Sequence, residues 1–411
     1  MTWTRPPRSA EAEAIYAAAD ADRAANPARY ALDGVADEVV ASAIGEQPEQ
    51  VLGDPDEWRP GLEHYLASAA DDARLNALGA RMARDTATGR LKARLKLSQL
   101  WATRPDIVER PLAAPIVIIG GWRTGTTFLF RCLATDPRLR APLPAELTAP
   151  WRFVGLDPEE RVARIDAGAA AHDFLHLLNP TMAAVHDSGA WLPEECVLAM
   201  GTDLRNWGFT STVRLPSYVE WLRGQDLGPA YLTHARILRA LDAGDGRRWV
   251  LKAPAHTAEL PALAAALPGA CIVHLHRDAV ATVASGASLF ATFRSTYSDD
   301  VDPADVGAAM LDQTELWLQR AEAFRRSPAA GGTTIVDLRY DDLVADPTAA
   351  LSSVYAAADM VAPADLPEMV ADYDAAHPRA AHGPHRYSPA DFALDVDEVR
   401  DRVGALDRSS V

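Results

Sequence analysis

The sequence has little cysteine and no long hydrophobic run. Its 411 residues include three cysteines, Cys132, Cys196 and Cys271, which lie far apart. An odd number of cysteines, so few and so far apart, predicts neither a disulfide framework nor a cysteine-rich zinc site. No run of about 18 apolar residues occurs, so no membrane-spanning helix is predicted. Residues 1–7 lack the basic-then-apolar layout of a secretion signal, and we expect a cytoplasmic protein.

Positive charge is also scarce. The chain has 40 Lys and Arg against 57 Asp and Glu, which gives a net charge of −17. This balance argues against a nucleic-acid partner, because such binding needs a basic surface. Two stretches differ: residues 116–144 carry four arginines and one acid, and residues 377–388 carry two arginines, three histidines and no acid. Each of these two basic stretches indicates a binding site for a small anion. The alternative is a solvent-exposed face on which positive charge has gathered by chance.

The chain divides into a helical part and an alternating part. Residues 1–110 are rich in Ala, Glu and Arg between Pro/Gly breaks, which predicts a helical region packed on the core. In residues 111–411, short β-branched apolar runs alternate with helical stretches, and we expect residues 151–245 to form a largely helical insertion over the sheet. The runs are residues 116–119, 249–251, 271–275 and 333–338. This pattern predicts an α/β, P-loop-like three-layer fold with a central, mostly parallel sheet.

Charged and aromatic side chains follow the predicted strands. Arg123, Lys252, Arg277 and Tyr340 each stand at or just after the end of one strand. In an open parallel sheet, ligands bind beyond the carboxyl ends of the strands, which share one edge. The sequence therefore predicts that three cations and an aromatic ring line one rim.

The segment after the first predicted strand has the composition of a phosphate-binding loop. Gly120 and Gly125 frame it, and a helix is predicted to follow. Glycines let the backbone approach an anion, and a helix N-terminus points N–H groups at it. The spacing nearly matches the nucleotide P-loop, but Thr126 takes the place of the lysine and the nearest strong cation is Arg123. The alternative is an ordinary helix N-terminus.

These blocks resemble the sulfotransferase superfamily, whose sulfuryl donor is 3′-phosphoadenosine-5′-phosphosulfate (PAPS) and whose nucleotide product is adenosine 3′,5′-bisphosphate (PAP). The resemblance covers about residues 90–405 and is to a large bacterial branch with an arginine-type loop. It implies a 5′-phosphosulfate loop made of Arg123, Thr124, Gly125, Thr126 and Thr127. It also implies that the 3′-phosphate is bound by Arg277 and Ser285 and covered by the C-terminal Arg386. The adenine would contact two aromatic residues, Phe128 and Tyr340.

The resemblance also implies a general base, since a hydroxyl must lose its proton as it attacks. Glu146 lies 23 residues after Arg123, an offset at which some relatives carry a glutamate base, and we predict it as the principal base. His256 is the other candidate, although it follows Lys252 by four residues where the histidine-base branch has two. Lys252 resembles a lysine that stabilises charge on the transferring group. Glu194 and Glu195 are a third, weaker option.

No metal site is predicted. A sulfuryl group carries less charge than a γ-phosphate and has less need of a cation. Asp337, on a predicted strand, is the only plausible magnesium ligand. His274 and His276 share one face of a strand, but no third ligand with convincing spacing accompanies them.

Three functions therefore compete. The first is metal-independent sulfuryl transfer from PAPS to a small-molecule hydroxyl acceptor. The others are an ATP-dependent kinase and a non-catalytic protein that binds 3′-phosphoadenosine nucleotides. Four tryptophans either pack the core or line an apolar acceptor pocket, and the second reading suggests a hydrophobic alcohol, phenol or lipid-like molecule. They are Trp151, Trp191, Trp207 and Trp221. The sequence does not specify an oligomeric state.

Overall fold

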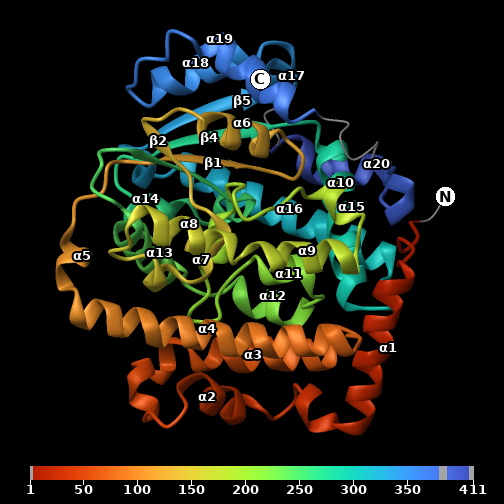
Figure 1. Cartoon of the computed structure of the whole chain (residues 1–411). Coiled ribbons are helices and arrows are strands. Elements are labelled where there is room, and N and C mark those ends of the chain that lie inside the picture. The colour runs from red at the N-terminus through yellow and green to blue at the C-terminus, as the bar shows by residue number, and fades with distance from the viewer. Residues whose placement is uncertain (1–2, 379–386, 407–411) are drawn as a thin grey trace.

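A five-stranded sheet forms the centre of the protein, with the order β2-β3-β1-β4-β5 (Figure 1). The computed structural model describes residues 3–378 and 387–406. The strands are β1 Ile116–Gly120, β2 Leu139–Arg140, β3 Arg248–Lys252, β4 Cys271–His276 and β5 Thr334–Arg339. Each pair of neighbouring strands is parallel. The predicted α/β fold with a central, mostly parallel sheet is confirmed.

Helices cover both faces of this sheet. Since side chains alternate along a strand, Ile116 and Ile118 of β1 join one buried cluster, and Val117 and Ile119 join the other. Figure 1 shows α18 and α19 on one side of the sheet and α16 on the other. The helices of the first face are α6 Thr126–Leu133, α17 Tyr340–Ala345, α18 Pro347–Ala357 and α19 Leu366–Ala376. Those of the second are α14 Leu260–Ala266, α15 Ala279–Tyr297, α16 Pro303–Arg325 and α20 Val396–Val399.

The N-terminal part is helical and shares the main core. Val39 and Leu62, from two of its helices, belong to the same buried cluster as Val117 and Ile119 of the central strand. Its helices are α1 Ala10–Ala25, α2 Ala36–Ile44, α3 Arg59–Asp71, α4 Ala77–Thr103 and α5 Pro105–Glu109. The N-terminal helices are thus held by burial against the α/β part.

Short helices and irregular segments fill the chain between β2 and β3. They are α7 Pro144–Thr148, α8 Pro158–Asp166, α9 Ala169–Leu178, α10 Met182–Val185, α11 Phe209–Thr212, α12 Pro216–Leu222 and α13 Gly228–Leu241. Proline at the first or second position starts several of them, where its missing N–H costs nothing. Across the described part of the chain, no helix combines the length and apolar character needed to cross a bilayer.

Helix α4 is joined to α15 by a cap and a close contact. The side chain of Asn76 accepts a hydrogen bond from the Gly79 N–H at 2.8 Å, and the Asn76 N–H donates to the Tyr297 carbonyl at 3.0 Å. A Cβ atom at Gly79 would stand 2.1 Å from that same carbonyl oxygen. Only glycine fits here without a shift of one helix against the other.

We predict opposite effects for two glycine-to-alanine changes in α4. Gly79→Ala should lower the free energy of unfolding by about 1–3 kcal/mol, the usual cost of overpacking. Gly89→Ala should raise it by about 0.5–1 kcal/mol, because alanine favours helix and a Cβ there meets nothing within 4 Å. Denaturant unfolding followed by circular dichroism measures both. Equal stability of the two variants would contradict the packing of α4 on α15.

Candidate active site

The predicted phosphate loop connects β1 to α6. At Gly125 the backbone has φ of +89°, and a Cβ there would stand 2.8 Å from the side chain of Leu343, so no other residue fits without strain. The Thr124 hydroxyl donates to the Gly121 carbonyl at 2.8 Å and fixes the turn. Arg123 also has a positive φ, +60°, and its side chain is exposed. The first turn of α6 thus opens toward solvent with a cation beside it.

The threonines of this loop have different surroundings. Thr124 and Thr126 are buried, whereas Thr127 is exposed. The Thr127 hydroxyl accepts a hydrogen bond from the Lys252 ammonium at 3.1 Å. Of the three, Thr127 is therefore the side chain best placed to meet a bound anion.

Arg277 and Tyr340 meet the loop from the other side. The Arg277 guanidinium donates to the Arg123 carbonyl at 2.9 Å, across 154 residues of sequence. It also lies over the Tyr340 ring, 4.4 Å from the centroid. The Tyr340 ring in turn lies 3.4 Å from the position of a Cβ on Gly125. Three of the four predicted strand-end groups therefore come together.

Ser285, Phe128 and Arg386 are also predicted to contact the nucleotide. Ser285 is buried on α15. Phe128 is half-buried and makes an edge contact with Tyr373 of α19, at 5.6 Å between ring centroids. Arg386 lies outside the described residues. The roles of all three at a nucleotide stay predictions.

Lys252 links the loop to the insertion. The residue ends β3 and is buried, and its ammonium pairs with Glu195 at 2.5 Å as well as with Thr127. Glu195 was the weaker alternative in the sequence, yet it is the carboxylate that reaches this cation. Lys252, the fourth of the predicted strand-end groups, thus contacts the phosphate loop and forms an ion pair with Glu195.

Glu146 has the surroundings of a structural residue. It is fully buried, and one carboxylate oxygen accepts a hydrogen bond from the Leu143 N–H at 2.9 Å as a cap of α7. The other oxygen pairs with Arg140 at 3.2 Å and with Arg161. Both oxygens thus have partners within the protein, and the side chain is enclosed. These contacts favour a structural role, and Glu146 as the base stays a prediction.

His256 is also enclosed. Its Nδ1 atom is 2.8 Å from the Tyr231 hydroxyl, and the ring is 1% exposed. Burial holds the pKa of His256 well below its ordinary value, which makes the ring a weak base. These contacts favour a structural role for His256, in which its ring hydrogen-bonds to Tyr231.

The structure brings forward a histidine that the sequence did not single out. His186 Nε2 lies 3.0 Å from a carboxylate oxygen of Glu194, in the segment that also carries Glu195. Burial would raise the pKa of Glu194, but His186, Lys252 and the Glu195 N–H lower it to about 2. Only Pro193-Glu194-Glu195 signalled this site in the sequence, because the pairing depends on how an irregular segment folds back.

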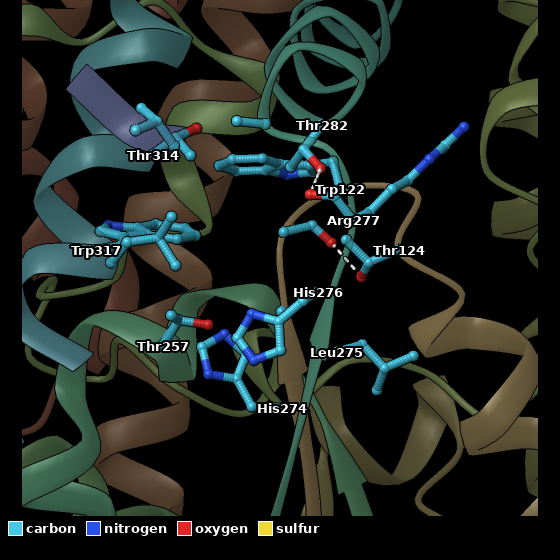
Figure 2. Close-up of a pocket in the computed structure, with 15 residues that line it drawn as sticks. Trp122, Thr124, Thr257, His274, Leu275, His276, Arg277, Thr282, Thr314 and Trp317 are labelled. Carbon is cyan, nitrogen blue, oxygen red and sulfur yellow. Dashed lines mark hydrogen bonds between the residues drawn. The ribbon is translucent and has the colours of Figure 1, made fainter. Parts of the chain in front are cut away.

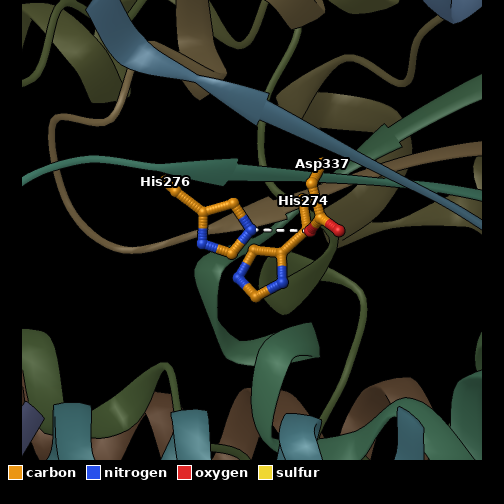
Figure 3. A group of neighbouring side chains, drawn as sticks. All are labelled: His274, His276 and Asp337. Carbon is orange, nitrogen blue, oxygen red and sulfur yellow. Dashed lines mark hydrogen bonds and ion pairs between the residues drawn. The ribbon is translucent and has the colours of Figure 1, made fainter. Parts of the chain in front are cut away.

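His274, His276 and Asp337 do form a group, which corrects the expectation that no third ligand accompanies the two histidines (Figure 3). Their ligand atoms lie within 4.8 Å of one another, since β4 and β5 pair His274 with Asp337. The Arg325 guanidinium donates to both Asp337 oxygens, at 2.6 and 3.0 Å, and lies 3.1 Å from His274 Nδ1. Burial opposes ionisation of Asp337, but His276 and Arg325 hold its pKa well below the usual range. An arginine thus supplies the positive charge of this group.

A cavity lies behind the phosphate loop (Figure 2). Thr124 lines it on the loop side, His274 and His276 line it at the strand, and Trp122 and Trp317, stacked at 5.2 Å, line it toward α16.

Among the tryptophans predicted near an acceptor, Trp207 belongs to the buried core, whereas Trp191 is 51% exposed.

Comparison with known proteins agrees with this arrangement. The sequence profile of the sulfotransferase family matches residues 115–363. The chain belongs to this family. The omega-hydroxy-beta-dihydromenaquinone-9 sulfotransferases Stf3 of Mycobacterium bovis and M. tuberculosis are 26% identical over 267 residues, 59% of this chain and 61% of theirs. The chain therefore spans about three-fifths of the length of those relatives.

Solved structures of sulfotransferases resemble it over most of its length. STF1 from M. tuberculosis H37Rv superposes with a TM-score of 0.74 at 29% identity, over 90% of this chain and 98% of that one. STF9 from M. avium shares the fold, with a TM-score of 0.75 at 22% identity over 91% and 96% of the two chains. The comparisons favour sulfuryl transfer over the kinase and the non-catalytic alternatives.

We predict that Glu146→Gln acts on stability. The change leaves Arg140 buried without its counter-charge, and breaking a buried pair typically costs about 3–5 kcal/mol. Denaturant unfolding should show this loss, while Glu159→Gln, an exposed acid on neighbouring α8, should change stability by less than about 0.5 kcal/mol. A Glu146→Gln variant that keeps full stability but loses turnover would restore Glu146 as the base.

Proposed function

We propose that this sulfotransferase moves a sulfuryl group from PAPS to the hydroxyl of a lipid-like acceptor. The observation that carries the proposal is the meeting of Arg277 and Tyr340 with the phosphate loop, joined through the Arg123 carbonyl at 2.9 Å. A donor with one phosphate at its 5′ end and another at its 3′ end would offer one phosphate to each of these two arginines. Members of the family are expected to use PAPS.

The residues take the following roles in the proposal. N–H groups at the start of α6 and the Thr127 hydroxyl hold the 5′-phosphate. Arg123 and Lys252 stabilise charge that develops between sulfur and the leaving phosphate. Arg277, with Ser285 and Arg386, binds the 3′-phosphate. Tyr340 and Phe128 contact the adenine.

A hydrophobic acceptor is supported by two observations. The relatives named Stf3 act, by their names, on an omega-hydroxylated menaquinone derivative. Phe174 of α9 is 47% exposed, and Trp191, which lies between His186 and Glu195, is 51% exposed. A cytoplasmic location stays our expectation.

Nucleotide binding tests the donor site. We expect PAP to bind at least tenfold more tightly than ATP or AMP, because only PAP places a phosphate at Arg277. Arg277→Ala should weaken PAP binding tenfold or more, since a charge-assisted contact contributes about 1.5–3 kcal/mol. Titration calorimetry measures both, with Arg326→Ala as the control, an arginine whose side chain is 77% exposed and paired with Glu322. Equal affinity for ATP and PAP would rule the donor site out.

Transfer itself should not need a divalent metal. Arg325 already neutralises the His274, His276 and Asp337 group, and the loop offers Arg123 and Lys252 as cations. We expect radiolabelled PAPS to sulfate a detergent-solubilised prenyl alcohol, geranylgeraniol, at the same rate with and without EDTA. Loss of activity in EDTA that magnesium or zinc restores would show that a metal participates.

A further inference from the structure

We propose that His186 is the general base that deprotonates the acceptor hydroxyl. Glu194 is the residue that holds the His186 ring in position and stabilises its protonated form. The proposal rests on the proposed function, because it concerns proton transfer in that reaction. It gives the role of the base to His186, which the sequence did not single out, and a positioning role to Glu194, which the sequence offered only as a weaker candidate for the base.

The turn from His186 to Glu194 is tied to the helix of the phosphate loop. Arg131 of α6 donates to the Asp187 carbonyl at 2.8 Å, to the Asp187 carboxylate at 3.1 Å and to the Pro193 carbonyl at 3.4 Å. One buried side chain thus holds both ends of the turn, next to His186 at one end and next to Glu194 at the other. The two residues meet because Arg131 fixes the ends.

The same turn borders the place where sulfur would lie. Val185, adjacent to His186, accepts a hydrogen bond from the Arg123 guanidinium at 3.5 Å. Glu195, adjacent to Glu194, pairs with Lys252, which also contacts Thr127. The pair is therefore flanked on both sides by the cations assigned to the transferring group.

The hydrogen bond of His186 to Glu194 leaves one ring nitrogen for proton transfer. Its Nε2 atom contacts Glu194, and no described residue hydrogen-bonds to Nδ1. With Nε2–H donating to the carboxylate, the lone pair on Nδ1 is open to a hydroxyl. The side chain is 24% exposed, whereas Glu194 is buried and fixed further by the Glu195 N–H at 2.8 Å.

The charges around His186 favour its protonated form. Burial would lower its pKa, but Glu194, by charge and hydrogen bond, and Glu195 raise the pKa above its ordinary value, against the opposing charge of Lys252. His172 of α9 also faces this group, Phe293 of α15 contacts the ring, and Asp187 is already paired with Arg131. A ring of raised pKa is a stronger proton acceptor, and it is competent only above that pKa.

The step balances without another reactant. The acceptor oxygen forms a bond to sulfur while the bond from sulfur to the 5′-phosphate oxygen breaks. That electron pair stays on the phosphate of PAP, which Arg123, Lys252 and the N-terminus of α6 stabilise. The acceptor proton passes to His186 Nδ1, and Glu194 stabilises the imidazolium.

The activity test uses four variants and geranylgeraniol as the acceptor. His186→Gln should lower the single-turnover rate by about 10²–10⁴, with PAP affinity by calorimetry unchanged within twofold. Added imidazole should partly rescue His186→Ala. His64→Gln, an exposed histidine on α3, should turn over as the unaltered enzyme does. Glu194→Gln should move the acidic limb of the rate profile to lower pH, because the carboxylate that raises the pKa of His186 is gone.

A second measurement needs no acceptor. In the full chain bound to PAP, the His186 resonance in a ¹³C-histidine spectrum, assigned with His186→Gln, should titrate above 6.5, the ordinary value, and should fall in Glu194→Gln. Near-normal turnover of His186→Gln, or a His186 pKa at or below the ordinary value, overturns the proposal. A protein that binds no PAP refutes the proposed function itself, which the calorimetry reports separately.

Discussion

Parallel pairing of β1 with β3 on one side and β4 on the other places three strand ends at one edge of the sheet. The first carries the phosphate loop, the second Lys252 and the third His276 followed by Arg277. Helices on both faces bury the strands, so the register cannot slip without exposing one face of the core. The pairing of β1, β3 and β4 thereby fixes where the backbone carries Lys252, Arg277 and the loop with Arg123.

Features that depend on local sequence could be predicted. The β1 run, the glycines after it and the groups that follow each strand define the sheet and the rim at its carboxyl ends. A parallel sheet brings these ends to one edge whatever the rest of the chain does. The Arg277 contact with the loop followed from that rule, although its partner, the Arg123 carbonyl, did not.

Burial and long-range pairing could not be predicted. Nothing in the spacing of Glu146 from Arg123 shows that Arg140 and Arg161 enclose its carboxylate. His186 lies in an irregular segment without periodicity, and its meeting with Glu194 depends on Arg131 holding both ends of a turn. Asp337, the third member of the His274 and His276 group, comes from another strand. Arg325 pairs with Asp337 and supplies the positive charge that a metal ion would otherwise bring. In each case the decisive fact is the partner that three-dimensional packing supplies.

The hydrogen bond from Arg277 to the Arg123 carbonyl joins the two ends of the proposed donor site through a single peptide unit. The arginine assigned to the 3′-phosphate thereby holds the backbone of the residue assigned to the reacting end. A nucleotide without a 3′-phosphate would leave Arg277 free to sit over Tyr340 and would leave the Arg123 peptide in its resting position. Discrimination between donors would then appear in how well the sulfur is aligned, and not only in how tightly the nucleotide is held.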